Sequence, residues 1–549
     1  MQKIIDILAI ILLLGAIINA SFYYTYFWQL KEYRFDRMKD FLSTPSGKAR
    51  MFNIFLLVKL LLLAFLLLGL LLGTVRQTLV FGLSWQELVY NIVLLLSLVE
   101  IGNAFWRMLQ HHLYRPEKTV KGVLIVFLTI LICLAWPIYL LMIASLTGYF
   151  FLALAWMSLL APLINVLIIA LFYPLTLFSK ALVLSRARRK IAQAQGLRII
   201  GITGSYGKST TKEFLAHILE KKFRVLKTPG NTNTEIGVAQ IILRHLKPEH
   251  EVFIVEAGAY KKGEIKKICR MVAPRMAVIT AVKDSHLALF GSLEQIKQTK
   301  FELIESLPSF GTAFFNTGNE GAHDLSKRAK TLELAKIITY SAVGEADLQA
   351  TDMQESSDGL QFKVKGVHFS TAVPGRHNVS NILGALAVGL ELGMTLQEMA
   401  EEVKTLKLRE HTLSVLHPSG DLTIIDDTYN ANPDGVMAAL DYLNTYRDKQ
   451  KIMVFPGMQE LGAKSAAEHR RIAKRIAEVC DYAYFTSLDF ARPLKEALRE
   501  KNFSDYLFIN QDQKKLLRLL RDRLASRPGA LLLISRGSEQ VLKKLTNAP

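Results

Sequence analysis

A glycine-rich segment from Gly201 to Glu213 carries the residue types that bind the phosphate chain of a nucleotide. Its sequence is Gly-Ile-Thr-Gly-Ser-Tyr-Gly-Lys-Ser-Thr-Thr-Lys-Glu. Glycines allow backbone N–H groups to wrap around phosphates, and the N-terminus of a following helix favours anions. In such a loop Lys208 reaches the β- and γ-phosphates and the Ser209 hydroxyl coordinates Mg²⁺. The segment predicts an ATP-type site, although Ile202 stands where the commonest form of this loop has its first glycine.

Two elements must position this loop. The apolar run Leu197–Thr203 suits a buried strand, and a helix is expected to begin at Lys208. A strand-to-helix turn that binds no ligand is the alternative interpretation of the same residues. If the loop binds ATP, the residues expected to contact the nucleotide are Gly204, Ser205, Gly207, Lys208, Ser209 and Thr210.

Short β-branched runs alternate with amphipathic stretches from Leu197 onward. This alternation predicts α/β layers around largely parallel sheets. Further strands are expected at Val252–Glu256, Met276–Val282, Ala313–Asn316, Leu422–Asp426, Ile452–Phe455, Ala483–Thr486 and Leu531–Ser535. Helices are expected to start after Pro433, Ser465 and Ser538.

Three domains are expected along the chain. Residues 1–190 form an α-helical transmembrane domain, residues 191–408 an ATP-binding α/β domain and residues 409–549 a second α/β domain. The boundary near residue 408 is placed where the helical pattern Val379–Leu406 ends and a new set of strands begins.

The N-terminal third contains five apolar runs long enough to cross a bilayer. They are Ile4–Trp28, Phe52–Gly73, Leu88–Trp106, Val120–Leu146 and Tyr149–Phe172. Basic residues concentrate in alternate loops and in a basic linker, Lys180–Lys190, that follows the last run. Because Lys and Arg favour the cytoplasmic side, this pattern predicts an outside N-terminus and cytoplasmic catalytic domains, where ATP is available.

The net charge of +19 does not indicate nucleic-acid binding, because much of the excess lies beside the apolar runs. There Lys and Arg interact with anionic lipid headgroups. The three cysteines have no metal-ligand spacing and predict reduced thiols.

Two charged residues, Lys59 and Glu100, fall inside apparent spans. A structural ion pair is the default interpretation, and contact with a membrane-embedded substrate is the alternative.

Several motifs in order resemble the Mur ligase family, whose enzymes build the peptide of cell-wall precursors. The central motifs are Thr203–Glu213, Thr228–Thr234 and Glu256–Ala259. The C-terminal motifs Asp426–Pro433 and Gly457–Gly462 resemble the MurF type. The resemblance runs from about Leu197 to the C-terminus. It implies a P-loop ATPase-like central domain, a Rossmann-like C-terminal domain and a ligase that couples D-alanyl-D-alanine, or a similar amino acid or dipeptide, to a peptidoglycan-type precursor.

The resemblance also implies the chemistry. A carboxylate is first phosphorylated by ATP to an acyl phosphate, and an amine then attacks to give an amide. The main demand is neutralisation of charge during phosphoryl transfer, which calls for lysine and divalent metal. By resemblance, Ser209 contacts a first Mg²⁺, and Glu256 and His286 hold a second Mg²⁺. Lys300 is the lysine that becomes carbamylated into an anionic oxygen donor near the metal. Lys208, Lys300 and His286 are therefore the expected catalytic residues.

The remaining site residues are also implied by the resemblance. Asn316 and Asn319 match positions that face the adenine, and Asp427 matches an acidic residue at the ribose. The substrate amine is expected beside Tyr429, Asn430 and Asn432. His377 and Asn378 fit a motif near the end of the central domain whose role can be purely structural.

The chain departs from the family pattern at several positions. Ala288 replaces an expected carboxylate, for which Asp284 is a possible substitute. Thr412 replaces an arginine, for which Arg409 is a candidate. Arg536 stands where lysine is usual, which keeps the charge and changes the geometry.

The largest departure is at the front, where the family normally has a small soluble domain that binds the UDP end of the precursor. The apolar block in that position leads to the hypothesis of an acceptor presented at the membrane on a lipid carrier. The alternative is that the spans only anchor an enzyme that uses UDP-linked precursors. Two other functions stay open: a membrane-bound ligase for another amide-linked polymer such as poly-γ-glutamate, and a membrane ATPase without ligase activity.

Overall fold

The computed structural model divides the chain into two compact units, Met1–Ala181 and Leu182–Pro549. It describes residues 2–43, 45–71, 78–80, 83–109, 114–142, 147–259, 261–283, 290–356, 358–408, 412–417, 421–428, 432–458, 461, 464–509, 512–525, 527–535 and 538–546.

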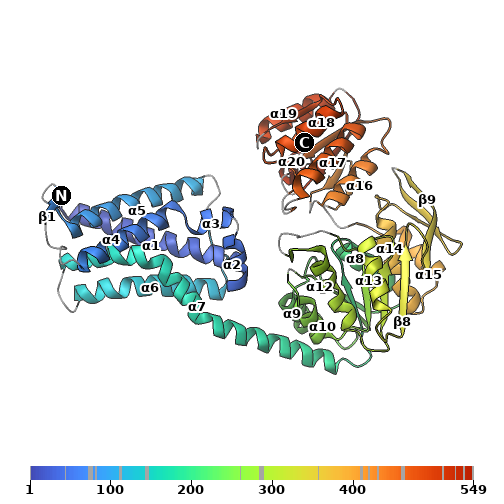
Figure 1. Cartoon of the computed structure of the whole chain (residues 1–549), viewed down its shortest axis with the longest axis horizontal. Coiled ribbons are helices and arrows are strands. Elements are labelled where there is room, and N and C mark those ends of the chain that lie inside the picture. The colour runs from blue at the N-terminus through green and yellow to red at the C-terminus, as the bar shows by residue number, and fades with distance from the viewer. Residues whose placement is uncertain are drawn as a thin grey trace. The chain divides into compact units, whose positions relative to one another are not determined.

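The N-terminal unit is a bundle of helices (Figure 1). Its elements are α1 (Gln2–Leu30), α2 (Phe35–Ser43), α3 (Pro45–Met51), α4 (Ile54–Leu71), the short strands β1 (Thr78–Val80) and β2 (Leu83–Ser84), α5 (Trp85–Leu109), α6 (Val120–Met142) and α7 (Thr147–Gln193). Apolar and aromatic side chains such as Phe27 and Trp28 fill the space between the helices. The expectation of an α-helical domain is confirmed.

The outside of this bundle is also apolar. Val120, Leu171 and Leu61 are 89%, 77% and 70% exposed. Among the described residues, four helices are long and apolar enough to cross a membrane: Ile4–Leu30, Tyr90–Leu109, Val120–Met142 and Phe150–Gln193. The remaining expected run, Phe52–Gly73, contains the helix α4, but α4 is not among those four. The count of five spans therefore stays a prediction.

Helix α7 extends well beyond the expected last span. It continues without interruption to Gln193, through the basic segment expected to be a linker. Its C-terminal part is not exposed on all sides, because Val183, Leu184 and Ala187 pack into the core of the second unit. The Lys190 ammonium also donates to the Leu243 carbonyl at 3.0 Å. The segment predicted as a linker is therefore helical, and its end packs on the second unit.

The second unit begins with a nine-stranded sheet in the order β11-β10-β9-β8-β7-β6-β3-β5-β4. Its strands are β3 (Arg198–Thr203), β4 (Val225–Lys227), β5 (Val252–Glu256), β6 (Met276–Ile279), β7 (Thr312–Asn316), β8 (Lys336–Ser341), β9 (Leu348–Ser356), β10 (Gly359–Val364) and β11 (Val367–Thr371). The strands β3 to β8 are mutually parallel, and β8 also pairs parallel with β9, whereas β10 pairs antiparallel with both β9 and β11. The expected parallel core is confirmed at β3, β5, β6 and β7, whereas β4, β8 and the antiparallel extension were not predicted.

Helices cover both faces of this sheet. One face packs against α8 (Lys208–Leu219), α14 (Asn378–Glu391) and α15 (Leu396–Lys404). The other packs against α9 (Glu235–His245), α10 (Glu264–Val272), α12 (Leu293–Glu305), α13 (Glu320–Ala329) and the end of α7. The single helical pattern expected at residues 379–406 is in fact two helices, because Gly393 adopts a φ of +83° that breaks the pattern.

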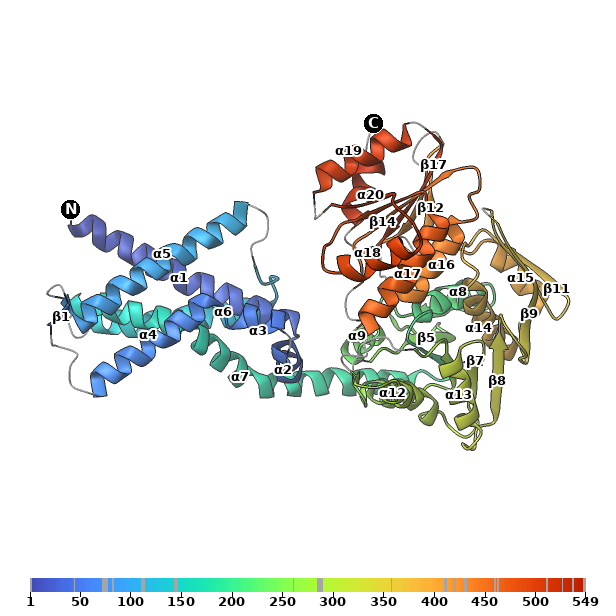
Figure 2. The ribbon, with the colours of Figure 1, turned by 45° about the horizontal axis from the view of Figure 1, so that its top comes forward.

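A six-stranded sheet forms the C-terminal domain, in the order β12-β13-β17-β14-β15-β16. Its strands are β12 (Ser414–Leu416), β13 (Thr423–Asp427), β14 (Gln450–Phe455), β15 (Tyr482–Phe485), β16 (Tyr506–Phe508) and β17 (Gly529–Ile534). Figure 2 shows it between two helical layers. They are α16 (Pro433–Leu443), α17 (Ser465–Val479) and α18 (Ala491–Glu500) on one face and α19 (Gln513–Leu524) and α20 (Glu539–Thr546) on the other.

Candidate active site

The glycine-rich loop joins β3 to α8, as the sequence predicts. The strand order places β3 between β5 and β6, and the chain leaves β3 and β6 in opposite directions along the sheet. Ligands in open α/β sheets bind at such a switch point, beside the carboxyl ends of the strands. The loop therefore lies where this architecture places a ligand.

Two glycines of the loop are required by its geometry. At Gly204 a Cβ atom would lie 2.0 Å from the Thr280 hydroxyl oxygen, so any larger residue would push the loop away from the end of β6. Gly207 has a φ of +80° at the start of α8, in the left-handed region that favours glycine. Within the described residues no side chain caps α8, so its first N–H groups are available to an anion.

The Lys208 side chain folds back over the loop. Its ammonium donates to the carbonyls of Gly204, at 2.8 Å, and Ser205, at 3.2 Å. Burial lowers the pKa of Lys208, and the negative charge of Glu256 opposes that shift. A phosphate bound at the start of α8 would provide a stronger, charged acceptor for this ammonium. Lys208 is thus held beside the expected phosphate position.

Glu256, at the end of β5, is the centre of a buried polar network. Its carboxylate accepts hydrogen bonds from the Ser209 hydroxyl at 2.8 Å, the Lys212 ammonium at 3.2 Å and the Asn233 amide at 3.1 Å. The Thr228 hydroxyl accepts from the Glu256 backbone N–H at 3.1 Å. The structure therefore brings together Ser209 and Glu256, two of the expected metal ligands.

Lys212 and Asn233 were not singled out in the sequence. Lys212 lies one helical turn after Lys208, so the i,i+4 spacing places both on one face of α8 and could have identified it. Its side chain is 0% exposed and also donates to the Gly230 carbonyl at 2.6 Å. Asn233 belongs to the motif Thr228–Thr234, which was recognised without a role for this residue.

The oxygen atoms at Ser209 and Glu256 fit a hard divalent cation, because Mg²⁺ prefers oxygen ligands and keeps several waters. The described residues contain no cluster of three or more His, Cys, Asp or Glu side chains that could hold a metal. His286, the third expected ligand, and Asp284, the possible substitute carboxylate, lie outside the described residues. Bound phosphate would have to supply further oxygens to such a cation.

Lys300 projects from α12 toward the same loop. Its ammonium nitrogen lies 2.9 Å from the Gly204 carbonyl oxygen, which Lys208 also contacts. The Lys300 side chain is buried, and burial holds its pKa well below the ordinary value, with the positive charge of Lys208 acting in the same direction. The geometry favours a neutral amine at this position over an ammonium ion.

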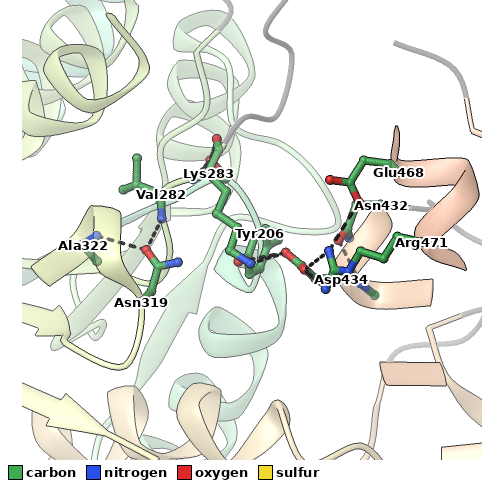
Figure 3. A network of polar contacts seen from close by, with 11 residues as sticks. Tyr206, Val282, Lys283, Asn319, Ala322, Asn432, Asp434, Glu468 and Arg471 are labelled. Atoms are coloured by element: carbon green, nitrogen blue, oxygen red, sulfur yellow. Dashed lines mark hydrogen bonds and ion pairs between the residues drawn. The ribbon is translucent and has the colours of Figure 1, made fainter. Parts of the chain in front are cut away.

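Asn316 and Asn319 lie at the end of β7 and the start of α13, and each is 8% exposed. The Asn319 side-chain oxygen accepts from the backbone N–H groups of Val282 and Ala322, at 2.8 and 3.0 Å (Figure 3). It thereby caps α13 and fixes the segment after β6. The Asn316 oxygen accepts from Gly318 N–H at 3.2 Å. These bonds shape the loop, and contact with an adenine stays a prediction.

Asp427 ends β13 in the C-terminal domain. One of its carboxylate oxygens accepts from the Leu413 backbone N–H at 3.2 Å. Burial raises the pKa of Asp427 to about 7, the Leu413 hydrogen bond opposes this, and the charge of Asp426 adds to it.

Asn432 caps α16 by accepting from Gly435 N–H at 2.9 Å. Tyr429 and Asn430, the other expected substrate residues, lie outside the described residues, as do Arg409 and Arg536.

A polar network connects the phosphate loop to the C-terminal domain (Figure 3). Its centre is Asp434, in the first turn of α16, whose carboxylate lies 2.5 Å from the Lys283 ammonium and 3.3 Å from the Arg471 guanidinium. The Tyr206 hydroxyl, from the loop itself, lies 3.5 Å from the same carboxylate. Burial raises the pKa of Tyr206, so its hydroxyl remains a donor at neutral pH. Nothing local in the sequence predicts this contact.

His377 and Asn378 stand at the start of α14. The Asn378 amide donates to the Pro374 carbonyl at 2.7 Å, and its oxygen accepts from Asn381 at 2.9 Å. Asn381 in turn accepts from the Thr211 hydroxyl of α8 at 3.3 Å. This chain of bonds joins α14 to the phosphate-loop helix, which supports the structural role considered for the motif.

Comparison with known proteins gives matches over the same two domains. Residues 202–389 match the Mur ligase middle domain, and residues 413–537 match the domain described as "Mur ligase, glutamate ligase domain". UDP-N-acetylmuramoyl-tripeptide–D-alanyl-D-alanine ligase of Bacillus subtilis is 30% identical over 67% of this chain and 79% of its own length. Three relatives of the same name are matched over only 58–63% of their own length.

Solved structures give the same grouping. MurF from Acinetobacter baumannii has a TM-score of 0.61 at 26% identity, covering 67% of this chain and 81% of that one. MurF ligase from Thermotoga maritima, solved in complex with ADP, has a TM-score of 0.59 at 27% identity, covering 67% of this chain and 83% of that one. The similarity covers the part of the chain that carries the site.

Proposed function

We propose that this chain, which belongs to the Mur ligase family, couples D-alanyl-D-alanine or a similar amino acid or dipeptide to the carboxylate of a peptidoglycan-type precursor. Its reaction class is that of the family, an ATP-dependent carbon–nitrogen ligase. The observation that carries the proposal is the convergence of Lys208, Lys300 and the Ser209–Glu256 pair around one phosphate loop.

The proposed reaction has two steps. An acceptor carboxylate oxygen attacks the γ-phosphorus of ATP, the bond to the bridging oxygen breaks, and ADP leaves. The substrate amine then attacks the acyl carbon, the carbon–oxygen bond breaks, and phosphate leaves with the former carboxylate oxygen. The amine loses a proton, and an amide remains.

The residues of this chain would act mainly by positioning and by charge. The N–H groups at the start of α8 bind the phosphates, and Lys208 exchanges its carbonyl partners for a phosphate oxygen. Ser209 and Glu256 would hold Mg²⁺. The bound ion would offset the negative charge that develops during phosphoryl transfer. Lys212 would help to orient the Glu256 carboxylate through Oε2, the same oxygen that the Ser209 hydroxyl contacts.

Lys300 is proposed to react with carbon dioxide to form a carbamate. That reaction requires a neutral amine, which is the form that burial and the charge of Lys208 favour at this position. The product is anionic, so its approach to Lys208 and to a bound cation is attractive, whereas the unmodified ammonium would repel both. The buried position on α12 therefore supports the modification that the family resemblance implies.

The C-terminal domain is proposed to bring the amine to the acyl phosphate. Asn432, together with Tyr429 and Asn430, would border the amine substrate, and Asp427 would contact the ribose of ATP. The Asp434 network holds this domain against the phosphate loop, because its cations come from both sides: Lys283 from the central domain and Arg471 from α17. The adenine would lie beside Asn316 and Asn319.

The helical unit is proposed to anchor the enzyme in the cell membrane with the catalytic unit in the cytoplasm. The number of crossings decides where the N-terminus lies. With α4 as a fifth span, the N-terminus is outside, whereas four spans place it inside. The 18 residues of α4 are about 27 Å long, close to the hydrocarbon thickness of about 30 Å. Single-cysteine labelling before residue 4, in intact cells, distinguishes the two topologies.

A membrane-held enzyme could take its acceptor from the lipid phase, and we propose a lipid-linked acceptor as the finer form of the function. Purified full-length protein in detergent would be given ATP, Mg²⁺ and D-alanyl-D-alanine with either a UDP-linked or a polyprenyl-linked acceptor. Amide product from either acceptor supports the ligase. Equal or better use of the UDP-linked acceptor would refute the lipid-linked form, and no amide from any acceptor–amine pair would refute the ligase itself.

A further inference from the structure

The helical unit contains a cavity of about 370 Å³ lined in about equal measure by polar and apolar surface. Residues from α1, α3, α4 and α5 contribute most of it, including three asparagines and three tyrosines. Its size falls within the range of about 300–1,000 Å³ typical of small-molecule sites. The charged and polar side chains of this lining are costly inside a bundle with an apolar exterior unless a ligand, water or another side chain satisfies them.

The charges that line the cavity do not balance. Three cations, Arg50, Lys59 and Arg107, face one carboxylate, Glu100. Lys59 and Glu100 neutralise each other, because they form an ion pair at 2.9 Å in which both side chains are at most 8% exposed. Two positive charges remain.

Arg50 and Arg107 supply that excess. Among the side chains that the structure describes, neither guanidinium forms an ion pair with a carboxylate. The Arg107 guanidinium lies 5.3 Å from the centre of the Tyr114 ring. Each arginine lies in the last turn of its helix, α3 or α5. An arginine presents a planar fork that binds phosphate oxygens in pairs.

The frame of the cavity does not depend on these guanidiniums. The Tyr23 hydroxyl donates to the Arg50 backbone carbonyl at 2.6 Å, and the Asn53 oxygen accepts from Leu56 N–H at 2.9 Å. These bonds fix the junction between α3 and α4. Both arginine side chains can therefore be replaced while the backbone that forms the cavity keeps its hydrogen bonds.

The rim of the cavity is apolar and exposed. Ile54 lines the cavity and is 66% exposed. Further along α4, Leu57 and Leu61 are 45% and 70% exposed. A hydrocarbon chain attached to a group in the cavity could lie along this surface, whereas a small soluble anion would gain nothing from it.

We propose that this cavity binds the phosphate group of a membrane amphiphile, with Arg50 and Arg107 contacting the phosphate oxygens and the hydrocarbon chain lying along α4. Soluble phosphate has the same oxygen chemistry as a lipid phosphate. The apolar rim favours the lipid, because only a lipid has a hydrocarbon chain that can bind there. The site is separate from the proposed ligase site, and binding there requires neither ATP nor ligase activity.

The test uses full-length protein in detergent, without nucleotide, and a fluorescent short-chain phosphatidic acid whose anisotropy reports binding. Competitors are unlabelled phosphatidic acid, the corresponding diacylglycerol and inorganic diphosphate. We expect Arg50→Gln and Arg107→Gln each to weaken binding by about tenfold or more, because each removes a charge-assisted contact. Arg107→Lys keeps the charge and should lose less than Arg107→Gln.

Arg115→Gln is the matched control, because Arg115 is exposed and does not line the cavity. The affinity of the Arg115→Gln variant for the fluorescent phosphatidic acid should remain within about twofold of that of the unaltered protein. Three results would each overturn the proposal: competition by diacylglycerol as strong as that by phosphatidic acid, competition by diphosphate as strong as that by the lipid, or equal weakening by Arg115→Gln. Thermal unfolding in the same detergent identifies any variant that has lost its fold. If Arg107→Gln has lost its fold, the binding measured for Arg50→Gln tests the proposal, because Arg50 is exposed and its replacement should leave the fold intact.

Discussion

Replacing Glu256 by glutamine separates the structural role of this carboxylate from its role in catalysis. In the folded chain the Glu256 carboxylate is 2% exposed and lies 3.2 Å from the ammonium of the fully buried Lys212. At that distance the attraction is about 5 kcal/mol for an effective dielectric constant of about 20. Glu256→Gln removes it and leaves Lys212 buried with one less partner.

The loss should be smaller than that attraction. Breaking a buried ion pair by removing one partner costs about 3–5 kcal/mol. Lys212 retains a second carboxylate, Glu213, at 3.5 Å, and Glu213 is itself 27% exposed. We therefore expect a loss at the lower end, about 3 kcal/mol, which lowers Tm by roughly 6–12 °C for a domain of this size.

A second substitution distinguishes the two roles. Lys212→Met in the Glu256→Gln background removes the uncompensated cation, and stability should return to within about 1 kcal/mol of the unaltered protein. Activity should not return, because an expected metal ligand is still absent. A loss of about 10²–10³ in kcat is expected for both the single and the double variant.

Differential scanning fluorimetry in detergent and an assay of phosphate release that depends on acceptor and amine provide the two readouts. Recovery of both stability and activity in the double variant would show that Glu256 is only a partner of Lys212. An unchanged Tm in Glu256→Gln would refute the energetic reasoning itself.

Three further predictions concern other buried charges. Lys300→Ala should abolish ligation. Short carboxylic acids should restore part of the activity, because they supply the anionic oxygens of the missing carbamate. A folded variant whose activity no short carboxylic acid restores would count against the carbamate. Lys59→Met should lower the Tm of the detergent-solubilised protein, since it leaves Glu100 unpaired, whereas Lys59→Met with Glu100→Leu should be close to the unaltered protein; a double variant as unstable as the sum of the singles would contradict this. The pKa of Asp427 rises to about 7 on folding, so the folded state holds this proton more tightly and stability falls as pH increases from about 4 to 7. Asp427→Asn should therefore raise Tm more at pH 8 than at pH 5. Equal Tm shifts at the two pH values would refute this pKa assignment.

The sequence predicted the phosphate loop and most of the parallel strands because their signals are local, but it missed the parallel strands β4, β8 and β16. The loop residues from Gly204 to Ser209 are contiguous, and the runs that became β3 and β5 consist mostly of apolar or β-branched residues. Buried parallel strands of this kind are recognisable without tertiary information.

The parts that the sequence did not predict depend on contacts between distant residues. Lys212 is an ordinary helix residue until Glu256 is placed beside it, and Asp434 meets Lys283 across 151 positions of the chain. The antiparallel strands β9 to β11 alternate exposed and buried residues, so they lack the continuous apolar run that identified the others. The basic segment before Gln193 was expected to be a linker because its charges obscured the apolar side that packs on the central domain.

The central claim is that this chain activates a carboxylate as an acyl phosphate and converts it into an amide. The most direct measurement uses an acceptor labelled with ¹⁸O in that carboxylate, with ATP, D-alanyl-D-alanine and the full-length protein, and follows the label by mass spectrometry. We predict that one labelled oxygen appears in the released phosphate and the other remains in the amide, in proportion to turnover. Unlabelled phosphate, or phosphate released at the same rate without acceptor and amine, would contradict the claim.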